Sequence, residues 1–130
     1  MVQKNSPMVE KLRRDELVVS IKLNVVDPVI AEIAQVPGID MLFFGPADFA
    51  HSLGIPCDLG NEKVTEARKR VAEVARRYGK LAGTVGGTGN MRELYEMGYR
   101  LINLGSDVFA LGDYFKNIMK QVEDWKGGEL

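Results

Sequence analysis

The hydrophobic positions of this chain alternate between two kinds of spacing, and the alternation predicts a succession of strands and helices. Four short runs are rich in β-branched, aromatic and other apolar residues, as β-strands are, and they cover residues 17–23, 41–44, 81–85 and 101–105. The run at 41–44 is apolar at every position, which is typical of a strand buried on both faces of a parallel sheet.

A segment with helical spacing follows each strand. Asp27 and Pro28 predict a helix start, with the aspartate as N-cap and the proline in the first turn. Asn90, paired with Glu93, and Asp113 are the expected caps of the last two helices. The apolar positions expected to face inward on the successive helices are Val29, Ile30, Ile33 and Ala34; Val64, Ala67, Val71, Val74, Ala75 and Tyr78; Met91, Leu94, Tyr95 and Met97; and Tyr114, Ile118, Met119, Val122 and Trp125.

Repeated strand and helix units without a hairpin signal predict the α/β class, with four consecutive parallel β/α units in a single domain over residues 1–130. A complete (β/α)8 barrel takes about 250 residues, so the chain matches half of a TIM barrel. The open edges of such a half predict a homo-oligomer in which two copies close one barrel. The alternative is a small open sheet with helices on both faces.

Composition narrows the classes of function. Seventeen Lys and Arg against eighteen Asp and Glu leave a formal charge of -1, which gives no overall attraction to nucleic acid or to an anionic membrane. The single Cys57 and the single His51 exclude an intrachain disulfide and most metal sites built on paired Cys or His, so any metal would be held by oxygen atoms. We expect a cytoplasmic protein without a nucleic-acid or membrane partner.

Asp48 is the strongest candidate for chemistry. It follows the apolar strand at 41–44, at the carboxyl edge where parallel folds bind ligands, and Gly45 and Pro46 allow a tight turn before it. A carboxylate at that edge suits a divalent cation such as Mg²⁺ or Mn²⁺. The structural alternative is that Asp48 caps a short helix beginning at Phe49.

Other segments offer weaker candidates. His51 lies three residues after Asp48 and is either a substitute base or ligand or, more simply, a solvent-facing residue. Residues 86–90, Gly-Gly-Thr-Gly-Asn, are either a cradle for a phosphate or carboxylate or a flexible turn. Ser106 and Asp107 follow the last strand, where Asp107 is alternatively a helix cap.

Residues 45–48, Gly-Pro-Ala-Asp, resemble the signature of the HpcH/HpaI aldolases, which include 2-keto-3-deoxy-sugar-acid aldolases. The resemblance includes Gly38-Ile39-Asp40 before this segment and Leu53-Gly54 after it. Residues 79–83 resemble the family's helix end and following strand, and residues 98–107 its last barrel strand. Residues 9–13 and the strand from Val18 resemble its first helix and strand, as though the central βα units were missing.

The resemblance implies a metal-dependent, class II pyruvate aldolase, a lyase that cleaves 2-keto-4-hydroxy acids to pyruvate and an aldehyde. It implies Asp48 as a ligand of Mg²⁺ or Mn²⁺ and the Ala47 backbone N–H as a contact of the substrate carboxylate. It further implies Gly45, Pro46 and Val85 in the keto-acid site, with Val85 near the methyl group. The family's Glu ligand, catalytic His and substrate-binding Arg have no counterpart, so no catalytic residue is assigned and the metal is expected to be held weakly.

Three functions therefore stand. The first is a pyruvate-type aldolase that is impaired in this short chain and needs a partner chain to complete its site. The second is a catalytically silent half-barrel that keeps weak metal or keto-acid binding. The third is a small open-sheet protein that binds phosphate or nucleotide at residues 86–90.

Overall fold

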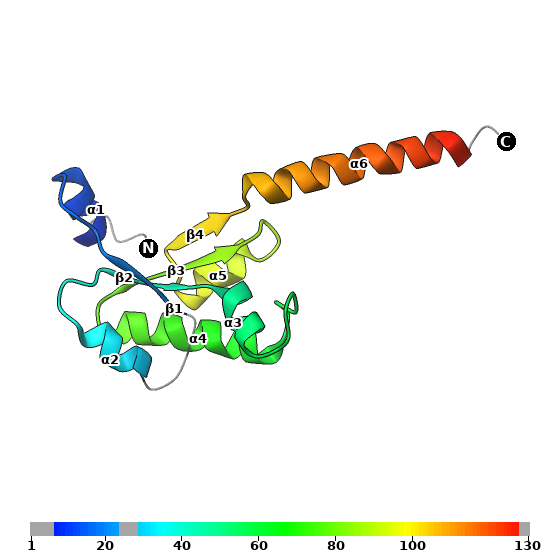
Figure 1. The fold of residues 1–130 in the computed structure, drawn as a ribbon. Coiled ribbons are helices and arrows are strands. Elements are labelled where there is room, and N and C mark those ends of the chain that lie inside the picture. The colour runs from blue at the N-terminus through cyan, green and yellow to red at the C-terminus, as the bar shows by residue number, and fades with distance from the viewer. Residues whose placement is uncertain (1–6, 24–28, 128–130) are drawn as a thin grey trace.

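A four-stranded parallel sheet is the centre of the fold (Figure 1). The computed structural model describes residues 7–23 and 29–127. The strands are β1 (Ser20–Leu23), β2 (Met41–Phe44), β3 (Leu81–Gly86) and β4 (Leu101–Leu104), and they lie side by side in chain order. The predicted α/β class, with four consecutive parallel units, is confirmed.

Six helices are described: α1 (Pro7–Arg13), α2 (Val29–Gln35), α3 (Pro46–Ser52), α4 (Glu62–Arg77), α5 (Met91–Met97) and α6 (Asp107–Gly127). The predicted cap at Asp27 and Pro28 lies outside the described residues. The alternative role of Asp48 as a cap is wrong, because α3 begins at Pro46, with Gly45 at its N-cap position, and places Asp48 inside the first turn.

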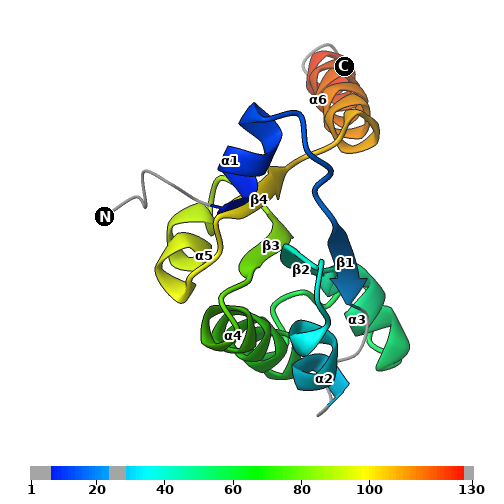
Figure 2. The same cartoon turned by 90° about the vertical axis from the view of Figure 1, so that its left-hand side faces the viewer.

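The core lies between the sheet and α4, and Figure 2 shows α4 and α2 together on one side of the strands. Successive strand residues point to opposite faces, so Leu42, Phe44 and Thr84 are wholly buried on the helix side. The apolar stripe predicted for α4 is confirmed: Val64, Ala67, Val71, Val74 and Ala75 are buried. Neighbouring residues on the strands, such as Phe43 and Val85, point to the opposite face.

Tyr99 ties the segment before β4 to α4. Its side chain is wholly buried, and its hydroxyl donates a 2.9 Å hydrogen bond to the backbone carbonyl of Arg68. Burial raises the pKa of the Tyr99 phenol, so the group stays protonated and remains a donor. The hydrogen bond therefore joins the segment between the third and fourth β/α units to α4, the long helix of the second unit, through a residue of the core.

Asp40 organises the opposite end of the sheet from the strand carboxyl ends. The Lys11 ammonium donates a 2.7 Å hydrogen bond to its Oδ1 atom, and the Val19 backbone N–H donates to its Oδ2 atom. The hydrogen bond from Lys11 lowers the pKa of the Asp40 carboxyl. This residue, part of the family-like Gly38-Ile39-Asp40 segment, therefore has a structural role that fastens α1 beside β1 and β2.

Helix α6 departs from the expectation. It begins at Asp107 instead of near Asp113, passes through Gly112, and projects away from the sheet (Figure 1). The residues predicted to face inward are instead solvent-exposed in this chain, with exposed fractions of 61% for Tyr114, 37% for Ile118, 57% for Met119, 36% for Val122 and 65% for Trp125. The periodic pattern identified an apolar helix face, but the surface that would cover it is not among the described residues.

In the part of the chain that the structure describes, no helix combines the length and apolar character that crossing a membrane requires.

Replacing Tyr99 by Phe tests the hydrogen bond between the units. We expect Tyr99→Phe to lower the free energy of unfolding by about 1 kcal/mol, because a buried donor to the Arg68 carbonyl is lost while the ring is kept. The control is Tyr95→Phe on α5. Tyr95 is predicted to face inward but is instead 42% exposed, so a change within about 0.5 kcal/mol is expected. Urea denaturation followed by circular dichroism measures both, and equal effects would contradict the assignment.

Candidate functional site

A cavity of about 820 Å³ opens at the carboxyl ends of the strands. All the residues predicted for the keto-acid site line it, namely Gly45, Pro46, Ala47, Asp48 and Val85. Gly86, Gly87, Asn90 and Ser106 line it as well, which brings the weaker candidate segments to the same place. His51 is exposed near the end of α3 and does not line this cavity.

One side chain from each strand contributes to the cavity wall: Lys22 from β1, Phe43 from β2, Val85 from β3 and Asn103 from β4. Lys22 pairs with Phe43 in the sheet register, and Val85 pairs with Asn103. Because side chains alternate along a strand, these residues share the face opposite to α4. The parallel register therefore assembles a single wall from residues that are far apart in the sequence.

Gly45 lies where the side chains of Lys22 and Asp48 converge. A Cβ atom at this position would come within 2.8 Å of Lys22 Cε and 2.9 Å of Asp48 Oδ2, closer than side chains tolerate. The Lys22 ammonium forms an ion pair with the Asp48 carboxylate directly beside it. The sequence analysis does not predict a role for Lys22. A usable signal was its place near the end of β1, the strand that precedes β2 and Asp48 in the chain.

The side chains around Asp48 do not by themselves fit a divalent cation. The Asp48 carboxylate is engaged by the Lys22 ammonium, which is a competing positive charge. Among residues 7–23 and 29–127, no group of three or more His, Cys, Asp or Glu side chains comes together to hold a metal. The metal-binding role of Asp48 stays a prediction, and further oxygen ligands would have to come from elsewhere.

The loop after β3 is held by its own asparagine. Asn90 Oδ1 accepts a 2.9 Å hydrogen bond from the Gly87 backbone N–H, and it makes no capping bond to α5. The predicted capping pair of Asn90 with Glu93 is therefore wrong, because the amide oxygen serves the glycine loop instead. This bond fixes the loop at the rim of the cavity.

Arg68 is a second residue that the sequence analysis missed. It lies on α4, lines the cavity, and is only 8% exposed. Burial lowers the pKa of its guanidinium, while Tyr99 and Glu93 act in the opposite direction. Its spacing from Val64 and Val71 puts it on the apolar stripe of the helix. Charged residues are rarely buried, so a charged residue on this stripe was the signal that could have identified it.

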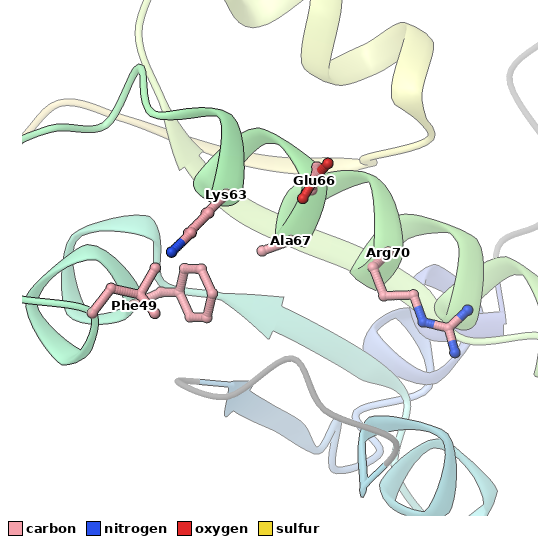
Figure 3. Close-up of a pocket in the computed structure, with 6 residues that line it drawn as sticks. Phe49, Lys63, Glu66, Ala67 and Arg70 are labelled. Carbon is pink, nitrogen blue, oxygen red and sulfur yellow. The ribbon is translucent and has the colours of Figure 1, made fainter. Parts of the chain in front are cut away.

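A smaller hollow of about 280 Å³ lies between α3 and α4 (Figure 3). Phe49 approaches Ala67 at its floor, and Lys63, Glu66 and Arg70 project around it. These charged side chains are exposed and lie on one solvent-facing side of α4. The cavity at the strand ends is the better candidate, because residues of all four strands and of the segments after β2, β3 and β4 line it.

Parallel β/α units with a cavity at their carboxyl ends define a TIM-barrel-like protein, of which this chain supplies four strands. The sequence pattern of the family described as HpcH/HpaI aldolase/citrate lyase matches residues 25–113. The chain belongs to this family.

Relatives and solved structures agree with this placement. The chain is 36% identical over 80 residues to the hydroxypyruvate/pyruvate aldolase of Paraburkholderia phytofirmans, covering 61% of this chain and 31% of that protein. It is 30% identical over 98 residues to the 2-keto-3-deoxy-L-rhamnonate aldolase of Escherichia coli, covering 75% and 37%. The crystal structure of an HpcH/HpaI aldolase from Desulfitobacterium hafniense superposes with a TM-score of 0.76 and 28% identity, covering 92% and 48%.

The chain thus spans about a third of the length of these curated relatives and about half of that crystal structure. These neighbours favour the half-barrel over an open sheet with helices on both faces. That the central units are the missing ones stays a prediction.

Lys22 allows the metal prediction to be tested. We expect Mn²⁺ to bind the chain only in the millimolar range or more weakly, and Lys22→Gln to tighten binding about tenfold by removing a neighbouring positive charge. Electron paramagnetic resonance of free Mn²⁺ measures both affinities. Lys69→Gln, at an exposed lysine outside the cavity, is the matched control. Micromolar binding to the unaltered chain would show that Lys22 does not compete for Asp48.

Proposed function

We propose that the chain forms the keto-acid pocket of a carbon–carbon lyase of the HpcH/HpaI aldolase type. The observation that carries the proposal is the meeting of Gly45, Pro46, Ala47, Asp48 and Val85 in one cavity at the strand carboxyl ends. The relatives named above are aldolases of pyruvate, hydroxypyruvate and a 2-keto-3-deoxy sugar acid. Their names support a substrate of the 2-keto acid class.

The first turn of α3 supplies the carboxylate contact in this proposal. Ala47 lies directly after Pro46 at the start of the helix, where backbone N–H groups have no partner inside the helix and favour an anion. Val85 is 38% exposed on the wall and offers an apolar surface to a methyl group. Together these residues bind and orient a small keto acid, and Phe43 limits the depth available to it.

Aldol cleavage also needs a base for the 4-hydroxyl proton and a positive charge near the enolate oxygen. Lys22 places an ammonium at the mouth of the cavity, beside Asp48. We assign no base among the described residues, since His51 does not line the cavity. Efficient turnover therefore depends on groups from a partner, and a silent half-barrel that only binds the keto acid is the second candidate.

Association is part of the proposal. The strands β1 and β4 each have one neighbour in the described sheet, which leaves an unpaired edge on either side. Helix α6 exposes Phe109, Phe115 and Trp125 at 75%, 58% and 65%. Unpaired edges and a long apolar surface both favour a second copy of this chain as the covering partner.

Pyruvate binding tests the pocket directly. We expect Val85→Asp to weaken pyruvate binding at least about tenfold, because it sets a carboxylate on the wall against an anionic ligand. Saturation-transfer NMR on the pyruvate methyl group measures the affinity. Val36→Asp, at a 48% exposed valine outside the cavity, is the control and should bind as the unaltered chain does.

Pyruvate release from a 2-keto-4-hydroxy acid, coupled to lactate dehydrogenase, then separates the two candidates. Turnover that is lost in Asp48→Ala supports the lyase, and pyruvate binding without turnover supports the silent half-barrel. Undetectable pyruvate binding would contradict both.

Sedimentation tests association. We expect the chain to sediment at twice its monomer mass or more at micromolar concentration, and Phe115→Glu to shift it toward monomer by placing a charge on the apolar face of α6. Lys116→Glu changes the charge at the neighbouring, 83% exposed position and should leave the mass unchanged. A stable monomer, indifferent to both substitutions, would contradict the two-half-barrel arrangement.

A further inference from the structure

Arg68 is a buried cation at the edge of the cavity. Its side chain is more than nine-tenths buried, and its Nε atom has no hydrogen-bond partner. The guanidinium forms no ion pair with a carboxylate in the described part of the chain, although Glu93 favours its charged form from a greater distance. Buried charges in folded proteins are normally paired, so an unpaired guanidinium here indicates a missing counter-ion.

Packing fixes where Arg68 lies. The Tyr99 hydroxyl holds the backbone carbonyl of Arg68, and α4 packs against β2 and β3 beneath the residue. The side chain reaches the same cavity as Gly86 at the end of β3 and Gly87 and Asn90 of the loop after it. The Asn90 amide holds this loop in place through the Gly87 N–H, so the surroundings of Arg68 are built and not merely open surface.

The charged side chains around the cavity also single out Arg68. Lys22 and Asp48 neutralise each other across Gly45, at the mouth formed by β1 and β2. Arg68 stands on α4, next to the loop after β3, and has no such partner among the described residues. Among the described residues that line the cavity, Arg68 is therefore the charged side chain left without a charged partner.

We propose that Arg68 and the loop after β3 form an anion subsite that binds an oxyanion group, a carboxylate or a phosphate, of the ligand in this cavity. A planar guanidinium with several donors matches either group by paired hydrogen bonds. The inference rests on the proposed function only in treating the cavity as the substrate pocket. It deepens that function, because it predicts a keto acid with a second anionic group instead of pyruvate alone.

Calorimetric titration of the full chain with inorganic phosphate, and separately with succinate, tests the subsite. We expect saturable binding of at least one of them in the millimolar range, weakened at least about tenfold by Arg68→Met. Arg68→Lys keeps the charge but loses the planar fork, so an intermediate affinity is expected. Stronger binding of phosphate assigns a phosphorylated ligand, and stronger binding of succinate assigns a dicarboxylate.

Thermal unfolding shows whether the Arg68→Met variant is folded. Removing an unpaired buried charge should leave the melting temperature of the ligand-free chain unchanged or raise it, while the rise produced by the bound anion disappears. Arg76→Met, at an exposed arginine on the same helix, should behave as the unaltered chain in both measurements.

Binding that is equal in Arg68→Met and the unaltered chain, or absent from the unaltered chain, would overturn the inference. So would an anion-independent loss of stability in Arg68→Met, since it would make Arg68 a structural residue. Pyruvate binding and its loss in Val85→Asp report on the proposed function separately, so either idea can fail while the other stands.

Discussion

The parallel alignment of the four strands is the constraint on which the rest of this structure depends. Because the strands are parallel, their carboxyl ends all lie at the same edge of the sheet. Successive side chains of a strand point to opposite faces, so alternate residues pack against the helices and line the cavity. Leu42 and Phe44 hold α4 through one face, while Phe43 between them faces the other. Stability and binding surface are therefore interleaved residue by residue along the same four-residue strand.

Prediction from the sequence succeeded where a local pattern and a global fold agree. The apolar run at 41–44 became β2 without a change of bounds, and the stripe on α4 was buried as its spacing required. The strand predicted at 17–23 was shortened at its start, because Leu17 is 81% exposed and only residues from Ser20 pair with β2. Local composition identifies a strand, but pairing partners decide where it begins.

The charged residues of the site were harder to predict. Asp48 was found because it follows a strand within a recognisable segment, whereas Lys22 acquires its role only from the register that sets it beside β2. Arg68 was hidden within a helix rich in exposed charges, and only its coincidence with the apolar stripe distinguishes it from Arg70 and Arg77. The sequence predicts Asn90 as a helix cap, but its amide oxygen instead accepts a hydrogen bond from the Gly87 N–H within the preceding loop. Short polar side chains commonly bond to nearby backbone groups in this way.

The stability of helix α6 depends on what packs against it. A single helix of 21 residues is only marginally stable in water when nothing packs against it, because nucleation is costly and propensity alone contributes little. Gly112 within the helix weakens it further. If a second copy covers the apolar face as proposed, the helicity of residues 107–127 becomes a collective property, and it should vary with protein concentration while the signal of the sheet does not.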